Sequence, residues 1–204
     1  MYRPLFFLAT CVFWLLFRVL FRWRVIGLEN VPAGGAIIAP NHRSFWDIPL
    51  VGLALRKRRT HFMAKSELFQ NPIFAWAIRT LLAFPVKRGA PDRAAIRHAI
   101  DVLQQGDLVA IFPEGTRSKT GQLGAAEPGL TLIAVKADVP IVPVGISGTQ
   151  LIFSKICWFP RLKIVFGKPI YISRSENMEK GMAETVSARV MGDIAQLIDD
   201  GLNK

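Results

Sequence analysis

The chain has 204 residues, with 26 Lys and Arg against 15 Asp and Glu, so its net charge is +11 and its pI is near 10.3. Hydrophobic residues make up 51% of the chain and charged residues 20%, which excludes a wholly disordered protein. The length fits one compact domain, or one domain plus a short appendage. The basic charge indicates an anionic partner, either nucleic acid or a membrane surface.

The positive charge is concentrated in the first part of the chain. Residues 1–91 hold 13 basic and 3 acidic residues, which gives +10, whereas residues 92–204 hold 13 and 12, which gives +1. A surface that contacts nucleic acid and a surface that lies against anionic lipid would both produce this distribution.

An apolar segment at 5–21 favours the membrane. Fifteen of its 17 residues are apolar, and only Thr10 and Arg18 interrupt it. A helix of this length is roughly 25 Å long, which is short for a bilayer core of about 30 Å. We expect residues 1–22 to form a membrane-anchoring helix, inserted or lying in the interface. A buried core helix is the alternative.

The rest of the chain, 23–204, is predicted to be one catalytic domain of the α/β class. Short apolar segments bounded by Gly, Pro or Asn alternate there with helical patterns. The predicted strands are 23–27, 36–40, 60–64, 82–87, 108–112, 141–145 and 162–167. The predicted helices are 44–55, 72–81, 91–105, 129–137 and 176–202. We expect a mixed, largely parallel sheet covered by helices.

A first polar group follows the predicted strand 36–40. His42 comes two residues after the strand, and Asp47 lies five residues beyond His42. Functional sites in open α/β sheets gather at the carboxyl ends of strands. One interpretation is structural, with Ser44 as the N-cap of the next helix and Asp47 as its capping-box partner. The other is a histidine base oriented by a carboxylate, which suits deprotonation of a substrate hydroxyl.

A second polar group follows the predicted strand 108–112. Gly115 permits a tight turn, and the planar guanidinium of Arg117 suits a phosphate or a carboxylate. Glu114 would accept a hydrogen bond from a substrate hydroxyl or hold Arg117 in place. A turn with a local Glu–Arg pair is the alternative.

Basic residues also follow two other predicted strands. Lys65 comes after 60–64, and Lys87 and Arg88 come at the end of the strand that follows it. Each is compatible with a solvated charge, but together with Arg117 they would form a cationic pocket for an anionic headgroup.

The run at 56–59, Arg-Lys-Arg-Arg, is either a solvated face or a contact with anionic lipid. No aromatic residues alternate with its charges, so we do not expect nucleic acid as a partner. The sequence holds no phosphate-binding glycine loop, dinucleotide fingerprint, nucleophile elbow or metal-binding helix. We therefore expect no metal and no cofactor.

Four ordered blocks resemble the glycerolipid acyltransferase family. They are Asn41-His42-x4-Asp47, Phe84-Pro85-Val86-Lys87-Arg88-Gly89, Phe112-Pro113-Glu114-Gly115-Thr116-Arg117 and Val139-Pro140-Ile141-Val142-Pro143-Val144. The subgroup that they resemble is the 1-acyl-sn-glycerol-3-phosphate acyltransferases. The resemblance implies that an acyl chain moves from acyl-CoA or acyl-acyl carrier protein to the 2-hydroxyl of lysophosphatidic acid, which gives phosphatidic acid for phospholipid synthesis.

The resemblance also assigns roles to residues. His42 would be the general base and Asp47 would orient it, with direct transfer and no acyl-enzyme. The phosphate and glycerol of the acceptor would be bound by Lys65, Arg88, Glu114, Gly115, Thr116 and Arg117. The expected location is an anionic membrane surface, on the cytoplasmic face of the inner membrane. The donor type and the oligomeric state stay open.

One position departs from the family pattern. Glu127 stands where many members carry a lysine, which removes one possible cationic contact with the acceptor. Another lysolipid or a lyso-aminolipid is therefore an alternative acceptor. A non-enzymatic basic module that binds membrane or nucleic acid is the alternative to an enzyme. A hydrolase is disfavoured because no nucleophile stands beside His42.

Overall fold

The computed structural model describes residues 3–87, 89, 92–118, 122–124, 126–127, 129–155, 157–172 and 181–202. The helices are α1 (Arg3–Leu20), α2 (Asp47–Ala54), α3 (Pro72–Thr80), α4 (Arg93–Gln104), α5 (Gly129–Ala137) and α6 (Met182–Leu202). The strands are β1 (Arg24–Ile26), β2 (Ala36–Pro40), β3 (Thr60–Lys65), β4 (Ala83–Val86), β5 (Leu108–Ala110), β6 (Ile141–Ser147) and β7 (Lys163–Phe166). Short 3-10 helices are η1 (Leu28–Asn30), η2 (Ser66–Phe69) and η3 (Thr149–Leu151).

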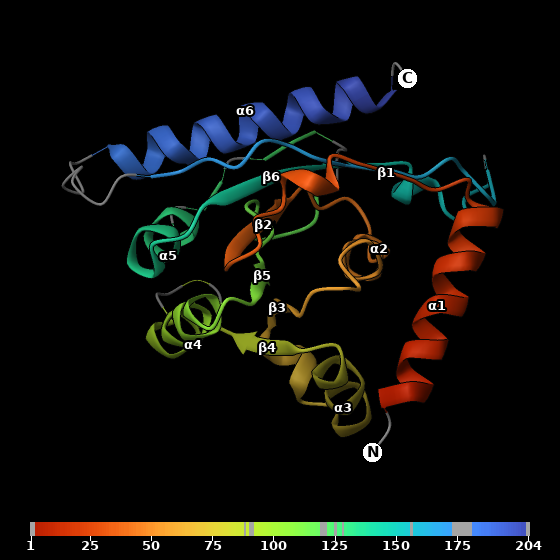
Figure 1. Cartoon of the computed structure of the whole chain (residues 1–204), viewed down its shortest axis with the longest axis horizontal. Helices are drawn as coiled ribbons and strands as arrows, with labels where there is room; N and C mark the ends of the chain where they lie inside the picture. The colour runs from red at the N-terminus through yellow and green to blue at the C-terminus, as the bar shows by residue number, and fades with distance from the viewer. Residues whose placement is uncertain are drawn as a thin grey trace.

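The strands form one seven-stranded sheet in the order β1-β7-β6-β2-β5-β3-β4 (Figure 1). All neighbours pair in parallel except β6 and β7, which are antiparallel. The predicted mixed, largely parallel sheet is therefore confirmed, and each predicted strand occurs with its bounds shifted by no more than two residues. β2, β5 and β6 lie in the interior of the sheet, where their apolar residues are buried on both faces.

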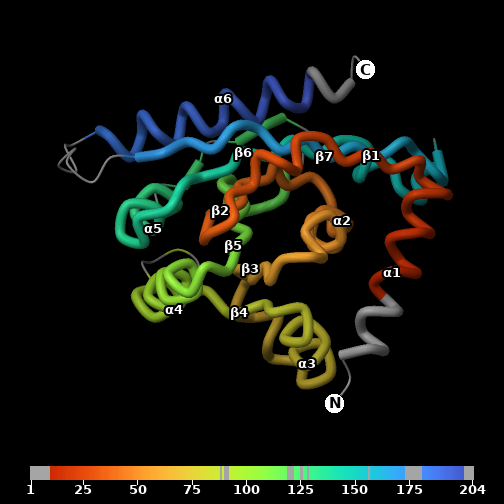
Figure 2. The backbone as a smooth tube through the Cα atoms, viewed as in Figure 1, coloured from red at the N-terminus to blue at the C-terminus, as the bar shows by residue number. Residues whose placement is uncertain are grey.

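Helices cover both faces of this sheet. In β2, Ile38 points into a core cluster shared with α2, whereas Ile37 points into a second cluster shared with α4, α5 and α6. This alternation is the period of two that strand geometry imposes. Figures 1 and 2 show the same layers, with α2 on one side of the sheet and α4, α5 and α6 on the other.

The start of α2 differs from the prediction. The helix begins at Asp47 rather than at 44, and its N-cap is Trp46, which makes no capping side-chain bond. The reason is that the Asp47 carboxylate turns back and accepts from the backbone N–H groups of Arg43 and Ser44. The bond from Ser44 is the one that the capping-box interpretation expects, and the Ser44 hydroxyl also accepts from the N–H of Trp46 at 3.3 Å. These contacts hold residues 43–46 in a turn, and the regular helix begins only at Asp47. The predicted first turns of the last helix, 176–180, lie outside the described residues.

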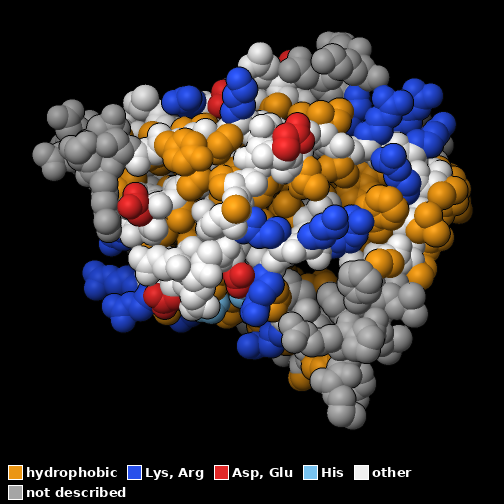
Figure 3. Space-filling model, viewed as in Figure 1, with side chains coloured by type: hydrophobic (Ala, Val, Ile, Leu, Met, Phe, Trp, Pro, Cys, Tyr) orange, Lys and Arg blue, Asp and Glu red, His pale blue; other side chains and the backbone are white. Residues whose placement is uncertain are grey.

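The segment predicted to be an anchor forms helix α1. Its C-terminal end packs as the alternative, a buried core helix, would, and contact with a membrane stays a prediction. Near its end, the rings of Phe17 and, one residue past it, Phe21 are buried in the core cluster of the α2 face. Large apolar side chains elsewhere on the helix are exposed, among them Phe13 and Val19. In Figure 3 hydrophobic side chains gather along the edge of the molecule where Figure 1 places α1. Among the described residues, no helix has the length and hydropathy that crossing a membrane requires.

The basic run at 56–59 is largely used within the fold. Arg58 donates to the carbonyl oxygens of Pro32, Gly34 and Gly106. Arg59 pairs with the carboxylate of Asp107, with 3.2 Å between the nitrogen and oxygen atoms. The guanidinium of Arg56 lies 4.6 Å from the centre of the Trp14 ring on α1, a cation–π contact. A uniformly solvated face is therefore not what this run forms.

Candidate active site

Three adjacent strands, β6, β2 and β5, run in the same direction and end at one edge of the sheet. The segments that follow them carry Thr149, the residues from His42 to Asp47, and the residues from Glu114 to Arg117. Sequence positions more than a hundred residues apart thus meet at the carboxyl ends of neighbouring strands, as expected for an α/β sheet.

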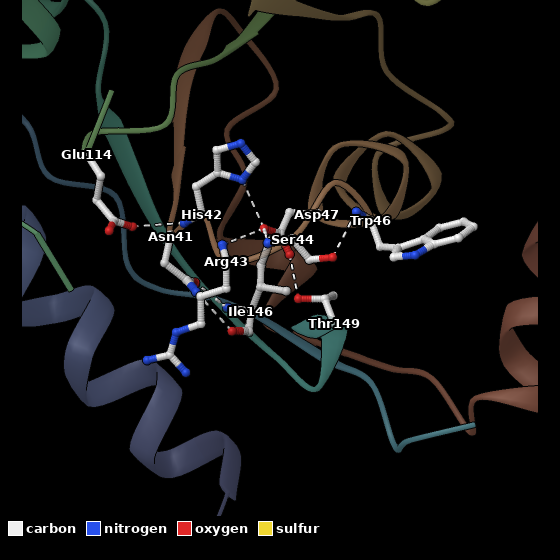
Figure 4. A network of polar contacts seen from close by, with 9 residues as sticks. All are labelled: Asn41, His42, Arg43, Ser44, Trp46, Asp47, Glu114, Ile146 and Thr149. Atoms are coloured by element: carbon white, nitrogen blue, oxygen red, sulfur yellow. Dashed lines mark hydrogen bonds and ion pairs between the residues drawn. The ribbon is translucent and has the colours of Figure 1, made fainter. Parts of the chain in front are cut away.

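The buried carboxylate of Asp47 is the centre of this group. Its Oδ2 accepts from the backbone N–H groups of Arg43 and Ser44, both at 2.7 Å, and lies 3.0 Å from Nδ1 of His42 (Figure 4). A carboxylate can only accept hydrogen bonds, so Nδ1 carries a proton. In the neutral ring, Nε2 then has the free lone pair that a general base requires.

The imidazole of His42 is held in a defined plane. Phe112, two residues after β5, stacks on the ring with 4.1 Å between the ring centroids. Figure 4 shows the Nδ1 side of the ring toward Asp47 and the Nε2 side directed away from it, while the side chain of Arg43 extends in another direction. Only 8% of His42 is exposed. The sequence therefore predicted the His–Asp pair correctly as neighbours, but it did not reveal the stacking by Phe112.

Glu114 contacts the backbone of the site. Its Oε1 accepts from the N–H of His42 at 2.9 Å, and its Oε2 accepts from the N–H of Gly124 at 3.1 Å. In the described part of the chain, no ion pair joins Glu114 to Arg117. The predicted local Glu–Arg pair is thus absent there, and the Glu114 side chain instead ties the loop after β5 to the backbone of His42. A contact between Glu114 and substrate stays a prediction.

Arg117 lies beside the turn that carries His42. Its guanidinium carbon lies 3.7 Å from the centre of the Phe45 ring, and the next residue, Ser118, donates its N–H to the carbonyl oxygen of His42 at 2.9 Å. Gly115, in the turn between Glu114 and Thr116, adopts a left-handed φ of 64°, a conformation that favours glycine. Thr116 and Arg117 are both exposed, so their polar groups are accessible to a ligand.

The other predicted cationic residues lie toward the far end of the sheet. Lys65 ends β3, and its Nζ forms an exposed ion pair with Glu67 at 3.0 Å. Arg88 lies outside the described residues. Its neighbour Lys87 lines a hollow of about 640 Å³ beside β4, to which His61 and His98 also contribute. Binding of phosphate by Lys65 and Arg88 stays a prediction.

Besides Phe112, two residues of the site were given no role by the sequence analysis, Asn41 and Thr149. Asn41 is buried, and its side-chain amide both donates to the carbonyl oxygen of Ile146 and accepts from the N–H of Ile146, which ties the end of β2 to β6. Thr149 donates its hydroxyl to Oδ1 of Asp47 at 2.6 Å. The available signal was weak, because a Gly-Thr pair at the end of a strand is also typical of an ordinary turn.

A family model described as Acyltransferase matches residues 22–147, which is more than half of the chain and includes β2, β5, β6 and the His–Asp pair. The chain belongs to the acyltransferase family. The resemblance seen in the four sequence blocks is thereby confirmed at the level of the family.

Individual relatives agree with this family. A protein of Streptococcus pneumoniae named 1-acyl-sn-glycerol-3-phosphate acyltransferase is 36% identical over 85% of this chain. A Bacillus subtilis protein of the same name is 34% identical over 72% of this chain and 73% of its own length. The crystal structure of the 1-acyl-sn-glycerophosphate (LPA) acyltransferase PlsC from Thermotoga maritima matches with a TM-score of 0.71 at 30% identity, over 89% of this chain and 73% of that one.

The aligned part of the chain spans only part of several relatives. It covers 64% of the Streptococcus pneumoniae protein and 46% of a chloroplast relative from Arabidopsis thaliana.

Removal of the Glu114 side chain should weaken the attachment of the loop after β5 to the backbone of His42. Because two backbone N–H groups would lose a carboxylate acceptor, we expect Glu114→Ala to lower the free energy of unfolding by about 2–4 kcal/mol. Glu114→Gln, which keeps one acceptor oxygen, should cost about half as much. Chemical denaturation measures both.

Glu67→Ala is the matched control, since Glu67 forms an exposed ion pair with Lys65 and should contribute little. An equal effect of Glu67→Ala and Glu114→Ala would contradict the anchoring role of Glu114.

Proposed function

We propose that the protein transfers an acyl chain from an acyl thioester to the 2-hydroxyl of 1-acyl-sn-glycerol-3-phosphate, which gives phosphatidic acid. The observation that carries this proposal is the His42–Asp47 pair, in which Nδ1 of His42 faces the carboxylate and Nε2 is directed away from it. The exposed guanidinium of Arg117 stacks on Phe45, in the turn between His42 and Asp47. Membership of the acyltransferase family and the names of the relatives support it.

His42 acts as the general base in this proposal. An alcohol is a poor nucleophile at neutral pH, so a positioned base that accepts its proton lowers the barrier. Nε2 takes the proton of the 2-hydroxyl while Nδ1–H stays on Oδ2 of Asp47, which stabilises the imidazolium that forms. Stacking by Phe112 and the bond from the His42 N–H to Glu114 limit the movement of the ring and of its backbone.

Transfer is direct. The acceptor oxygen forms a bond to the thioester carbonyl carbon, the carbon–sulfur bond breaks, and the proton held by His42 passes to the departing thiolate. The thioester is already activated, so no covalent enzyme intermediate is required. Among the described residues no hydroxyl or thiol is hydrogen-bonded to His42, which supports this route. Acyl-CoA and acyl-acyl carrier protein both supply such a thioester, and no metal or cofactor takes part in the proposal.

The acceptor phosphate is assigned to Arg117, supported from the strands beyond β5 by Lys65 and Arg88. A guanidinium fork offers two parallel donors to phosphate oxygens, and stacking on Phe45 holds its plane. Glu127 lies within reach of Gly115, near the same loop. Its negative charge keeps a different lysolipid, including a lyso-aminolipid, as the alternative acceptor.

Helix α1 is assigned to the membrane surface, on the cytoplasmic face of the inner membrane. Helix α1 exposes several large apolar side chains, among them Phe13 and Val19. Arg18 and Arg22 at its end suit anionic headgroups. Both substrates are amphiphiles, so a helix that lies in the interface would bring the site to them.

The proposed base leads to a sharp activity test. His42→Ala should lower kcat for acyl transfer to lysophosphatidic acid by about 100- to 10,000-fold, because the hydroxyl would lose its proton acceptor. His98→Gln is the matched control, since His98 lies on α4 away from the pair. A thiol-release assay with acyl-CoA and acyl-acyl carrier protein, against a panel of lysolipids, measures both. Turnover near wild type in folded His42→Ala would exclude the mechanism.

The role of Arg117 is separable from that of the base. Arg117→Ala should raise KM for lysophosphatidic acid by about 10-fold or more and change kcat little, because it removes a charged contact with the phosphate. Lysolipids without an exposed phosphate monoester should show an unchanged KM. If KM for lysophosphatidic acid also stays constant, Arg117 does not bind the phosphate.

The proposed membrane contact of α1 is tested by its exposed side chains. Phe13 and Val19 are 55% and 65% exposed, so the double substitution Phe13→Ser with Val19→Ser should lower partitioning onto anionic phospholipid vesicles by about 10-fold or more. Sedimentation with vesicles at low and high salt measures it. Tyr171→Ser, which alters an equally exposed aromatic residue elsewhere, should leave binding unchanged. Equal losses in both variants would argue against α1 as the contact.

A further inference from the structure

The carboxylate of Asp47 has a donor from a distant part of the chain. Thr149 Oγ1 donates to Oδ1 at 2.6 Å, across 102 positions of sequence. Both residues are buried, with exposed fractions of 1% for Thr149 and 0% for Asp47. The other donors reach Oδ2 and come from 42–44. Within the described residues, Thr149 is thus the only hydrogen-bond donor to Oδ1.

Because donors reach both oxygens of Asp47, the orientation of the carboxylate plane is fixed. The torsion about the last side-chain bond of an aspartate is broad, and rotation about it moves both carboxylate oxygens at once, so a bond at Oδ1 opposes the same rotation that would carry Oδ2 away from its donors. A second hydrogen bond at Oδ1 fixes the plane of the group. It therefore also fixes the direction in which the lone pairs of Oδ2 meet Nδ1–H of His42.

Thr149 is itself held firmly. Gly148 before it has a φ of 90°, and a Cβ at Gly148 would clash with the carbonyl oxygen of Arg161, so the turn that presents Thr149 favours glycine. The N–H of Leu151 closes the turn on the carbonyl oxygen of Gly148 at 3.0 Å. Upstream, the Asn41–Ile146 pair fastens β6 to the strand that carries the base. A β-branched side chain on such a backbone has few rotamers.

We propose that Thr149 is a positioning residue for the base, which holds Oδ1 of Asp47 and so sets the plane of the His42 ring and the nitrogen that keeps its proton. Thr149 does not contact the reacting atoms in this proposal, which rests on the proposed role of His42 as the base. The loop after β6 thereby contributes to catalysis through Asp47.

Kinetics of Thr149 variants test the proposal. Thr149→Val keeps the shape and removes the hydroxyl, and it should lower kcat by about 10- to 100-fold with KM nearly unchanged, because only the orientation of the base is lost. Thr149→Ser keeps the hydroxyl and should restore most of kcat. Thr131→Val is the matched control, since Thr131 is a buried threonine on α5 whose hydroxyl contacts Ser187 and the Ala183 carbonyl oxygen.

A double-mutant cycle separates positioning from general destabilisation. In an Asp47→Asn background the base is already misaligned, so adding Thr149→Val should lower kcat by no more than about twofold. A full additional loss in that background would assign Thr149 to folding alone and overturn the proposal. Wild-type kcat in folded Thr149→Val would overturn it as well.

The imidazole nitrogens give a readout that does not depend on turnover. The chain has three histidines, so nitrogen NMR on histidine-labelled protein resolves His42 with His61 and His98 as internal references. Thr149→Val should shift the Nδ1–H signal of His42 and leave the other two in place. If Thr149→Val does not fold, Thr149→Cys, with a weaker donor of similar size, should shift the same signal.

Failure of the proposed function and failure of the positioning role of Thr149 would give different results. A wild-type protein without acyl transfer to any acceptor in the panel would remove the proposed function, whereas the His42 signal would still show whether Thr149 orients the pair. A His42 signal that is the same in wild type and in every folded Thr149 variant would overturn the positioning role.

Discussion

The site depends on the hydrogen bonds that stabilise the buried carboxylate of Asp47. A carboxylate removed from water is stable only when donors replace the lost hydration, and here the His42 ring, two backbone N–H groups and the Thr149 hydroxyl supply them. These donors cannot be satisfied unless the turn after β2 and the loop after β6 take up their observed conformations. The need to stabilise one charge thus fixes the backbone on both sides of it and delays the start of α2.

Much of this architecture could be predicted because its signals are local. The strands of the interior are short apolar segments between turn residues, and their pattern depends only on burial. β2 and α5 begin and end at the predicted residues. The proximity of His42 and Asp47 also follows from their short spacing. The predicted start of α2 was three residues early. The capping rule anticipates the bond from the Ser44 N–H to Asp47, but not the second bond from Arg43 to the same oxygen, and the residues before Asp47 form a turn and not helix.

The remaining parts of the site depend on strand order, which no local pattern specifies. Thr149 meets Asp47 only because β6 lies next to β2, and Glu114 reaches the His42 backbone only because β5 lies on the other side. In the sequence, Thr149 belongs to a Gly-Thr turn and Glu114 is an acidic residue in a loop. Because β6, β2 and β5 are adjacent in the sheet, Thr149 contacts Asp47 and Glu114 contacts His42. Membership of the acyltransferase family indicates the class of reaction. The geometry of the site identifies the side chains that hold His42 and Asp47 in position.

The long sequence separations within the site have a consequence for the order in which the protein is made. Bonds to the turn after β2 come from Glu114, Ile146 and Thr149, so the His42–Asp47 pair cannot take up all of its observed contacts until residue 149 has left the ribosome. Helix α1 emerges before these segments, yet the core that receives Phe17 and Phe21 includes side chains from β6 and β7. Since chains begin to fold from the N-terminus during synthesis, the apolar helix is exposed throughout the period in which the catalytic geometry is still incomplete.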